Sequence, residues 1–290
     1  MILVVDSGST KTDWIAIDKN GNMLFSTQTL GLNPQVLSSA ILNERIINNY
    51  DLFQNRKEFT HLYFYGAGCG VETPKKRIEK VFREIFINSE LIIKEDTYAA
   101  VYSSVTIGEP AIVCILGTGS NCTYYDGKDI EQRVVSLGYI LMDEASGNFF
   151  GKQLIRSYYF NKMPTHLAKE FEKQFDLSPD AIKEKVYRKE NPNTYLATFS
   201  KFLIEHKDDA VFQEIIEKGL QRFVDHQIFQ FDNAKEIPVH FIGSIAYFLE
   251  TEIRKLFDEK GLIMGRIVRR PIDELVIYHK NLLDQKFSLE

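Results

Sequence analysis

Residues 4–13 read VVDSGSTKTD: an apolar strand ends at an acidic residue, a turn of small residues follows, and a second strand begins. Small residues let the main chain approach a ligand closely, and successive backbone N–H groups in such a turn bind phosphate oxygens. Asp6, at the end of the first strand, is placed to hold Mg²⁺ through water molecules. An ordinary β-hairpin has a similar pattern, but the spacing matches neither a Walker loop nor a Rossmann fingerprint.

A second turn of this kind follows about 110 residues further along the chain. The apolar run IVCIL, residues 112–116, leads directly into GTGSN, residues 117–121. A repeat on this scale predicts two related lobes whose glycine turns hold one triphosphate from both sides. Residues 108–110 read GEP, a typical turn sequence. We therefore expect an N-terminal lobe over residues 1–107 and a C-terminal lobe with a helical insertion over residues 108–290.

Hydrophobic periodicity predicts an α/β chain. Strands are expected at residues 2–5, 13–17, 23–26, 61–65, 91–94, 112–116 and 239–242. Helices are expected at residues 36–49, 75–87, 144–160, 167–175, 179–189, 193–205, 210–231 and 245–259, and a short one from residue 96. The first three strands are expected to form a meander, because Asn20-Gly21 is a typical hairpin turn.

Two further positions lie where a predicted strand gives way to a helix. Asp96, within IIKEDTYAA (residues 92–100), occupies a common N-cap position, but a carboxylate there also suits the acceptor side of a phosphoryl transfer. Gly243, followed by Ser244 in IGSIA (residues 242–246), would let a base or ribose lie against the main chain. Taken alone, both positions are typical of ordinary strand-to-helix connections.

The composition limits the classes of function. The 290 residues are 44% hydrophobic, enough for a sizeable core, and the net charge of −5 argues against a nucleic-acid or anionic-lipid partner. The three cysteines show no CxxC spacing, and the six histidines show no metal-ligand spacing. The amino terminus lacks a basic region and a cleavage site, and no apolar run is long enough to span a bilayer. We therefore expect a cytoplasmic protein.

The motifs taken together resemble those of a known family. The segments DSGSTKT (residues 6–12) and GTGSN (residues 117–121), with Asp96 and Gly243-Ser244, resemble the N-acetylglucosamine kinase and BadF/BadG-type ATPase family of the actin, hexokinase and heat-shock-70 superfamily. The resemblance covers nearly the whole chain. It implies an α/β, two-lobed, actin-like ATPase (ribonuclease H-like) fold with duplicated mixed-sheet domains. It also implies an ATP-dependent carbohydrate kinase that uses Mg²⁺ and phosphorylates an amino sugar such as N-acetylglucosamine.

The resemblance also implies roles for individual residues. It makes Asp96 the general base for the sugar 6-hydroxyl. The expected nucleotide contacts are Gly8, Ser9, Thr10, Lys11, Thr12, Gly117, Thr118, Gly119, Ser120, Gly243 and Ser244. The expected sugar contacts are Asn33, Gly68, Asp96, Asn121 and Asp143. Without the resemblance, Asn33 would be read as a turn residue before proline and Asp143 as a helix cap.

Other functions stay open on the sequence. Residues 137–139 read LGY where mammalian-type kinases of this family have a Gly-Trp-Gly-His run, so N-acetylglucosamine, N-acetylmuramic acid, glucosamine and glucose are all candidate substrates. An ATPase that activates a radical dehydratase would share the phosphate turns but needs a cysteine pair for an iron–sulfur cluster. A nucleotide-switched binding module is a third class. A homodimer is compatible with the sequence, which marks no interface.

Overall fold

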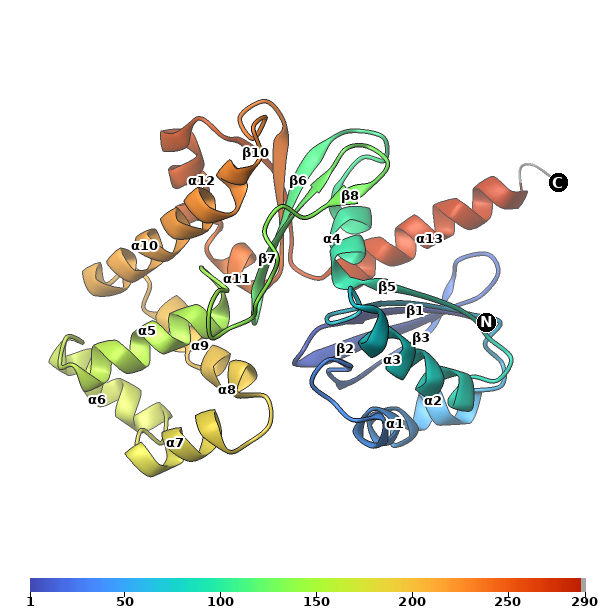
Figure 1. Ribbon diagram of the computed structural model, residues 1–290, viewed down its shortest axis with the longest axis horizontal. Helices are drawn as coiled ribbons and strands as arrows, with labels where there is room; N and C mark the ends of the chain where they lie inside the picture. The colour runs from blue at the N-terminus through green and yellow to red at the C-terminus, as the bar shows by residue number, and fades with distance from the viewer. Residues whose placement is uncertain (288–290) are drawn as a thin grey trace. The chain divides into compact units, whose positions relative to one another are not determined.

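Two five-stranded sheets form the framework of the chain, one in each of two units (Figure 1). The structure is a computed structural model that describes residues 1–287 and the side chains of residues 1–282. Unit 1 comprises Met1–Val105 together with the described chain from Arg270 onward, and unit 2 comprises Thr106–Arg269. The α/β class with duplicated mixed sheets, predicted from the sequence, is confirmed.

Unit 1 contains the first sheet, with the strand order β3-β2-β1-β4-β5. Its strands are β1 (Ile2–Ser7), β2 (Lys11–Ile17), β3 (Met23–Leu30), β4 (His61–Gly66) and β5 (Glu90–Glu95). The strands β1, β2 and β3 form the predicted antiparallel meander, and β4 and β5 continue the sheet in parallel with β1. The parallel strands bring the carboxyl ends of β1, β4 and β5 to one edge of the sheet.

Helices cover both faces of this first sheet. They are α1 (Ser39–Ile47), α2 (Tyr50–Asn55), α3 (Glu72–Ile85), α4 (Asp96–Ser104) and α13 (Pro271–Phe287). Leu3, Val5 and Trp14 pack with buried residues of α1, α2 and α3, whereas Val4 and Ile15 pack with residues of α4 and α13. Because β1 and β2 are buried on both faces, they read as continuous apolar runs rather than alternating ones.

Unit 2 repeats the sheet topology of unit 1. Its strands are β6 (Ala111–Leu116), β7 (Ser120–Tyr125), β8 (Ile130–Glu131), β9 (Pro238–Ile242) and β10 (Ile263–Val268). They lie in the order β8-β7-β6-β9-β10, with the first three antiparallel and the last two parallel to β6. Each strand thus has a counterpart in unit 1, and the repeat indicated by the two glycine turns extends to the whole sheet. The strands β7, β8 and β10 were not among the predicted ones. In β10, Gly265 and Arg266 interrupt the apolar run.

The helices of unit 2 enclose a core rich in phenylalanine. They are α5 (Gly147–Tyr159), α6 (Thr165–Gln174), α7 (Pro179–Tyr187), α8 (Pro192–Thr198), α9 (Ser200–Glu205), α10 (Ala210–His226), α11 (Ser244–Phe248) and α12 (Glu250–Lys260). Phe150, Phe171, Phe202 and Phe223 are fully or almost fully buried in this core. Burial of such large aromatic side chains contributes strongly to stability. The single helix expected over residues 193–205 is divided at Phe199 into α8 and α9.

The last helix departs from the expected lobe assignment. Residues 108–290 were expected to form the second lobe, but α13 packs against α4 and β1 in unit 1 (Figure 1). The physical reason is its apolar face: Ile272 and Leu275 are fully buried in the core of unit 1, and the imidazole of His279 lies 3.0 Å from the hydroxyl of Tyr65. The units divide between Val105 and Thr106, and residues 288–290 lie outside the described part of the chain.

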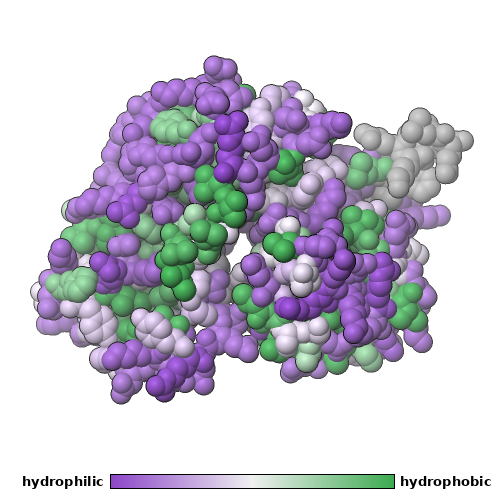
Figure 2. Space-filling view, viewed as in Figure 1, coloured by the Kyte–Doolittle hydropathy of each residue, from purple (hydrophilic) through white to green (hydrophobic). Residues whose placement is uncertain are grey.

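Purple, hydrophilic side chains predominate on the face drawn in Figure 2, with smaller green patches of apolar residues between them. Among residues 1–287, the helices are all too short or too polar to cross a lipid bilayer.

Candidate active site

The first glycine turn joins β1 to β2 and lies directly on a second segment of the chain. The backbone N–H of Gly8 donates to the carbonyl of Lys11 at 3.0 Å, and the N–H of Gly31 donates to the carbonyl of Thr10 at 3.0 Å. A Cβ atom at Gly31 would lie only 2.3 Å from the carbonyl oxygen of Ser9. Close packing of Gly31 against the main chain of the turn therefore holds the turn in place. Gly8 and Thr10 are exposed.

Thr12 supports this turn from inside the fold. The residue is fully buried, and its hydroxyl lies 2.7 Å from the hydroxyl of Ser7 and donates to the carbonyl of Leu30 at 3.3 Å. The Ser7 hydroxyl also accepts a hydrogen bond from the N–H of Leu32 at 3.1 Å. Thr12 was expected to contact the nucleotide, but these bonds give its side chain a supporting role.

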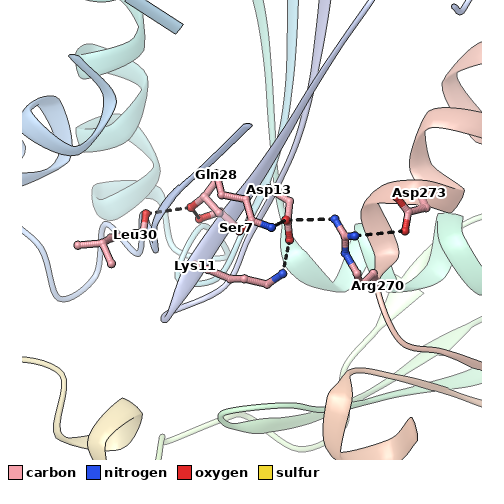
Figure 3. Close-up of polar contacts among 8 residues, drawn as sticks. Ser7, Lys11, Asp13, Gln28, Leu30, Arg270 and Asp273 are labelled. Atoms are coloured by element: carbon pink, nitrogen blue, oxygen red, sulfur yellow. Dashed lines mark hydrogen bonds and ion pairs between the residues drawn. The ribbon is translucent and has the colours of Figure 1, made fainter. Parts of the chain in front are cut away.

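The buried carboxylate of Asp13 forms ion pairs with two cationic side chains (Figure 3). Its side chain pairs with the ammonium of Lys11 at 2.8 Å and with the guanidinium of Arg270 at 3.3 Å. It also accepts a hydrogen bond from the amide of Gln28 at 2.6 Å. Lys11, an expected phosphate contact, is thus held beside the first turn, and Arg270 ties the start of α13 to β2. These ion pairs and this hydrogen bond compensate the cost of burying the Asp13 carboxylate.

Asp6 lies opposite Asp13 in the β1–β2 register. Burial, followed by the charges of Asp96 and Asp13, raises its pKa to about 7, although Lys11 and Arg270 act in the opposite direction. An excess of negative charge at a strand end suits a divalent cation. In the described part of the chain, no three histidine, cysteine or acidic side chains are grouped so that they alone could hold a metal ion. The single carboxylate of Asp6 would fit Mg²⁺, an ion that proteins usually hold through one or two carboxylates together with water and phosphate oxygens.

Replacing Asp6 by asparagine should stabilise the metal-free protein more at pH 8 than at pH 5. The folded protein keeps the Asp6 proton up to about pH 7, whereas an unfolded aspartate releases it near its ordinary value of 3.8. The free energy of unfolding of the wild type therefore decreases as the pH rises through this window. The asparagine variant has no such carboxyl and should avoid about 2 kcal/mol of this decrease. Thermal unfolding in EDTA at the two pH values measures the difference.

Asp18→Asn is the matched control for this experiment. Hydrogen bonds from Asn22 and Asn20 lower the pKa of Asp18, so its ionised form stabilises the native state at pH 8. This variant should lose stability at pH 8. If Asp6→Asn changed the stability equally at both pH values, burial would not raise the pKa of the Asp6 carboxyl.

Asp96 begins α4 directly after β5, at the same sheet edge as Asp6. Ser7 of β1, Gly66 of β4 and Glu95 of β5 are aligned across this edge. Burial first and the neighbouring Glu95 second raise the pKa of Asp96 to about 7. The charge of Asp96 in turn raises the pKa of Asp6, so the two carboxyl groups are near neighbours. A carboxylate with a pKa near neutrality suits a general base.

Asn33 and Gly68 meet beside the first glycine turn. The amide of Asn33 donates to the hydroxyl of Ser9 at 3.4 Å and accepts the N–H of Gln35 at 2.9 Å. Gly68 has a φ of +80°, and a Cβ atom there would lie 2.2 Å from the amide oxygen of Asn33. Two expected sugar contacts and one nucleotide contact thus lie together in unit 1.

Two arginines that the sequence did not mark hold the segment that carries Asn33. Arg77 of α3 donates to the carbonyls of Pro34 at 2.6 Å and Leu37 at 3.2 Å. Arg45 of α1 donates to the carbonyl of Gly31. In the sequence both are ordinary basic residues of amphipathic helices, and no local signal distinguishes them from solvated ones.

The second glycine turn and Gly243 come together in unit 2. The N–H of Gly117 donates to the carbonyl of Gly119 at 2.9 Å, closing the turn between β6 and β7. Ile115 and Ile242 are aligned in the parallel β6–β9 pair, so both strands end at one edge. Gly243 has a φ of +111°, and a Cβ atom there would lie 2.4 Å from the carbonyl oxygen of Leu116. The predicted adenosine and phosphate segments are therefore adjacent, with Ser244 exposed.

Asp143 lies against this second turn. A Cβ atom at Gly119 would lie 2.9 Å from its carboxylate, which accepts the backbone N–H of Ser120. Burial raises the pKa of Asp143, while hydrogen bonds from Asn148 and Ser120 oppose the rise. The cap of α5 is Ser146, so the alternative of a helix cap does not hold for Asp143. Asn121, on β7, uses its amide oxygen to accept the N–H of Cys122 at 2.8 Å.

We compared the chain with known proteins. Neither protein-family models nor curated proteins gave a match. Among solved structures, a candidate N-acetylglucosamine kinase from Porphyromonas gingivalis is 32% identical, with a TM-score of 0.88 over 97% of this chain and 99% of that one. A second candidate N-acetylglucosamine kinase, from Chromobacterium violaceum, is 16% identical, with a TM-score of 0.71 over 96% and 98% of the two chains.

A glucokinase of the ROK family from Streptomyces griseus, in complex with glucose and AMPPNP, shares the fold at 12% identity and a TM-score of 0.57, over 98% of this chain and 99% of that one. The duplicated sheets, each with a glycine turn after its first strand, define a member of the actin-like ATPase superfamily. Within that superfamily, the chain belongs to the N-acetylglucosamine kinase family.

Proposed function

We propose that this protein is an ATP-dependent sugar kinase that phosphorylates the 6-hydroxyl of an amino sugar such as N-acetylglucosamine. The observation that carries the proposal is the position of Asp96, whose carboxyl has a pKa near 7 at the same sheet edge as the first glycine turn. Membership of the N-acetylglucosamine kinase family supports the substrate class.

ATP is the proposed phosphoryl donor. Its phosphates would accept hydrogen bonds from backbone N–H groups of the two glycine turns, at residues 9–11 and at Thr118 and Gly119, since the N–H groups of Gly8 and Gly117 close the turns. Its adenosine would lie along Gly243 and Ser244. AMPPNP in the Streptomyces griseus glucokinase, which has the same fold, supports this choice of nucleotide. Asp6 would hold Mg²⁺ through water, and the ion would neutralise charge on the β- and γ-phosphates.

The sugar is proposed to bind through Asn33, Gly68, Asn121 and Asp143. Asp96 accepts the proton of the 6-hydroxyl as the sugar oxygen forms a bond to the γ-phosphorus. The bond between that phosphorus and the β,γ-bridging oxygen breaks, and ADP leaves with the bridging oxygen. The proton on Asp96 then passes to solvent, which restores the base.

A coupled assay of ADP release tests this function. Purified protein with Mg²⁺ and ATP is offered N-acetylglucosamine, N-acetylmuramic acid, glucosamine and glucose in parallel. We expect N-acetylglucosamine to give the largest kcat/KM. If no sugar raises ADP release above the rate with ATP alone, the kinase proposal fails and a bare ATPase takes its place.

The alternative of an activator with an iron–sulfur cluster gains no support from the cysteines. Cys114 and Cys122 face each other across β6 and β7, with sulfur atoms 3.5 Å apart, and both are almost fully buried. Burial and the neighbouring Cys122 raise the pKa of the Cys114 thiol. Such thiols are poor metal ligands, because a cluster needs thiolates.

A further inference from the structure

Asn148, in the first turn of α5, makes an unusual set of contacts with the second glycine turn. The residue is completely buried. Its side-chain amide donates to the carbonyl of Thr118 at 2.7 Å and to the carboxylate of Asp143 at 2.8 Å. Its backbone N–H donates to the same Thr118 carbonyl at 3.0 Å. One residue therefore holds the middle of the turn through the main chain and the side chain together.

These contacts determine the direction of the turn's peptide groups. The carbonyl of Gly117 accepts the N–H of Gly147 at 2.8 Å, so two successive carbonyls, of Gly117 and Thr118, point toward the start of α5. In a trans peptide the N–H points opposite to the C=O. The N–H groups of Thr118 and Gly119 must therefore point away from α5. Successive N–H groups with a common direction are the geometry that binds phosphate oxygens.

The orientation of the Asn148 amide is fixed by chemistry. Both partners of its NH₂ group, the Thr118 carbonyl and the Asp143 carboxylate, can only accept hydrogen bonds. If the amide were reversed, its oxygen would face the Thr118 carbonyl oxygen and the Asp143 carboxylate oxygen, and no hydrogen bond could form. The amide oxygen itself is buried and has no hydrogen-bond partner in the described part of the chain, so the side chain acts through its NH₂ group.

Asp143 needs this support. Its φ of +73° lies in the left-handed region, which costs a residue other than glycine of order 1 kcal/mol. The carboxylate takes hydrogen bonds from Asn148 and from the N–H of Ser120, and it leaves no room for a side chain at Gly119. Asn148 thus joins the strained Asp143 to the Thr118 carbonyl in the middle of the turn, and Asp143 in turn binds the N–H of Ser120.

We propose that Asn148 is a positioning residue that orients the backbone N–H groups of the second glycine turn toward the phosphates of the nucleotide. The proposal rests on the proposed function in that it takes ATP as the ligand, but it does not depend on the sugar. It assigns Asn148 an effect on phosphate binding that is separate from adenosine binding. An Asn148 variant should therefore discriminate among adenosine nucleotides by their phosphates.

Calorimetric binding of AMPPNP, ADP and adenosine, with Mg²⁺ and without sugar, tests the proposal. Asn148→Ala removes the NH₂ group and should weaken AMPPNP about tenfold or more, by the loss of charge-assisted and neutral hydrogen bonds, while adenosine changes less than about twofold. Asn148→Asp sets a carboxylate against Asp143 and should weaken AMPPNP further. Asn148→Ser keeps the backbone bond and one donor, and it provides a milder variant if the others fail to fold.

Ser157→Ala is the matched control, because Ser157 is a buried polar residue of the same helix whose hydroxyl has no hydrogen-bond partner in the described part of the chain. It should leave all three affinities unchanged. Equal weakening of AMPPNP and adenosine in a folded Asn148 variant, or unchanged AMPPNP affinity, would overturn the proposal. Failure of the wild type to bind AMPPNP would overturn it too. Binding of AMPPNP without any sugar-dependent turnover would reject the kinase and leave this assignment in place.

Discussion

Asp96→Asn should fold and bind ATP like the wild type but turn over about 100- to 10,000-fold more slowly, the usual contribution of a positioned general base. Asparagine has nearly the same shape but cannot take the acceptor proton. The pKa of Asp96 near 7 also predicts that wild-type kcat falls as the pH is lowered below neutrality, because the base becomes protonated. Steady-state kcat with saturating sugar, measured from pH 5.5 to 9, checks both results.

Glu95→Gln is the informative comparison for this variant. Glu95 raises the pKa of Asp96, so its neutralisation should move the acid limb of the pH profile to lower pH and keep kcat at pH 8 within about tenfold of the wild type. Asp96→Asn should show no acid limb from this group at all. Turnover of the Asp96 variant close to that of the wild type would remove Asp96 from the mechanism.

Gly31→Ala should destabilise unit 1 and weaken nucleotide binding together. The new methyl group would lie 2.3 Å from the Ser9 carbonyl oxygen and 2.5 Å from that of Gly8, so the first glycine turn has to move. Overpacking of this kind costs about 1–3 kcal/mol, equivalent to a fall of several degrees in the unfolding midpoint. Thermal unfolding and AMPPNP binding measure the two effects.

Gly8→Ala is the control for Gly31→Ala, because it replaces a glycine of the same turn without creating a close contact. A Cβ atom at Gly8 would meet its nearest neighbour, the Lys11 carbonyl oxygen, at an ordinary 3.8 Å, so the unfolding midpoint should stay close to that of the wild type. If Gly31→Ala is as stable as Gly8→Ala and binds AMPPNP normally, Gly31 does not fix the turn.

The sequence predicted the parts of the fold that depend on local pattern. The glycine turn around Gly8 recurs around Gly117, and this repeat predicted two related lobes; the structure shows that the two sheets also have the same strand order. Asp96 and Gly243 were placed correctly at the ends of strands, because an apolar run followed by small or acidic residues is a local signal. The segment that forms α13, for which no helix was predicted, was assigned to the second lobe with the rest of residues 108–290, because the local sequence does not show which sheet a segment packs on.

The supporting residues of the candidate site could not be predicted in this way. Arg270 reaches Asp13 across more than two hundred residues, and Arg77 reaches the carbonyl of Pro34 from a helix whose charges look solvated. Asn148 did carry a weak signal, as a polar residue within the buried segment GNFFG (residues 147–151). Long-range hydrogen bonds depend on how elements pack, which periodicity does not encode.

Transfer of labelled phosphate from [γ-³²P]ATP to N-acetylglucosamine tests the central claim most directly, because it separates a kinase from an ATPase. After incubation with Mg²⁺, the sugar phosphate and the free phosphate are resolved by chromatography, with Asp96→Asn in parallel. We predict that the wild type places most of the released label on the sugar and that the variant places almost none there. Label found only in free phosphate, at the same rate with and without sugar, would contradict the proposed function.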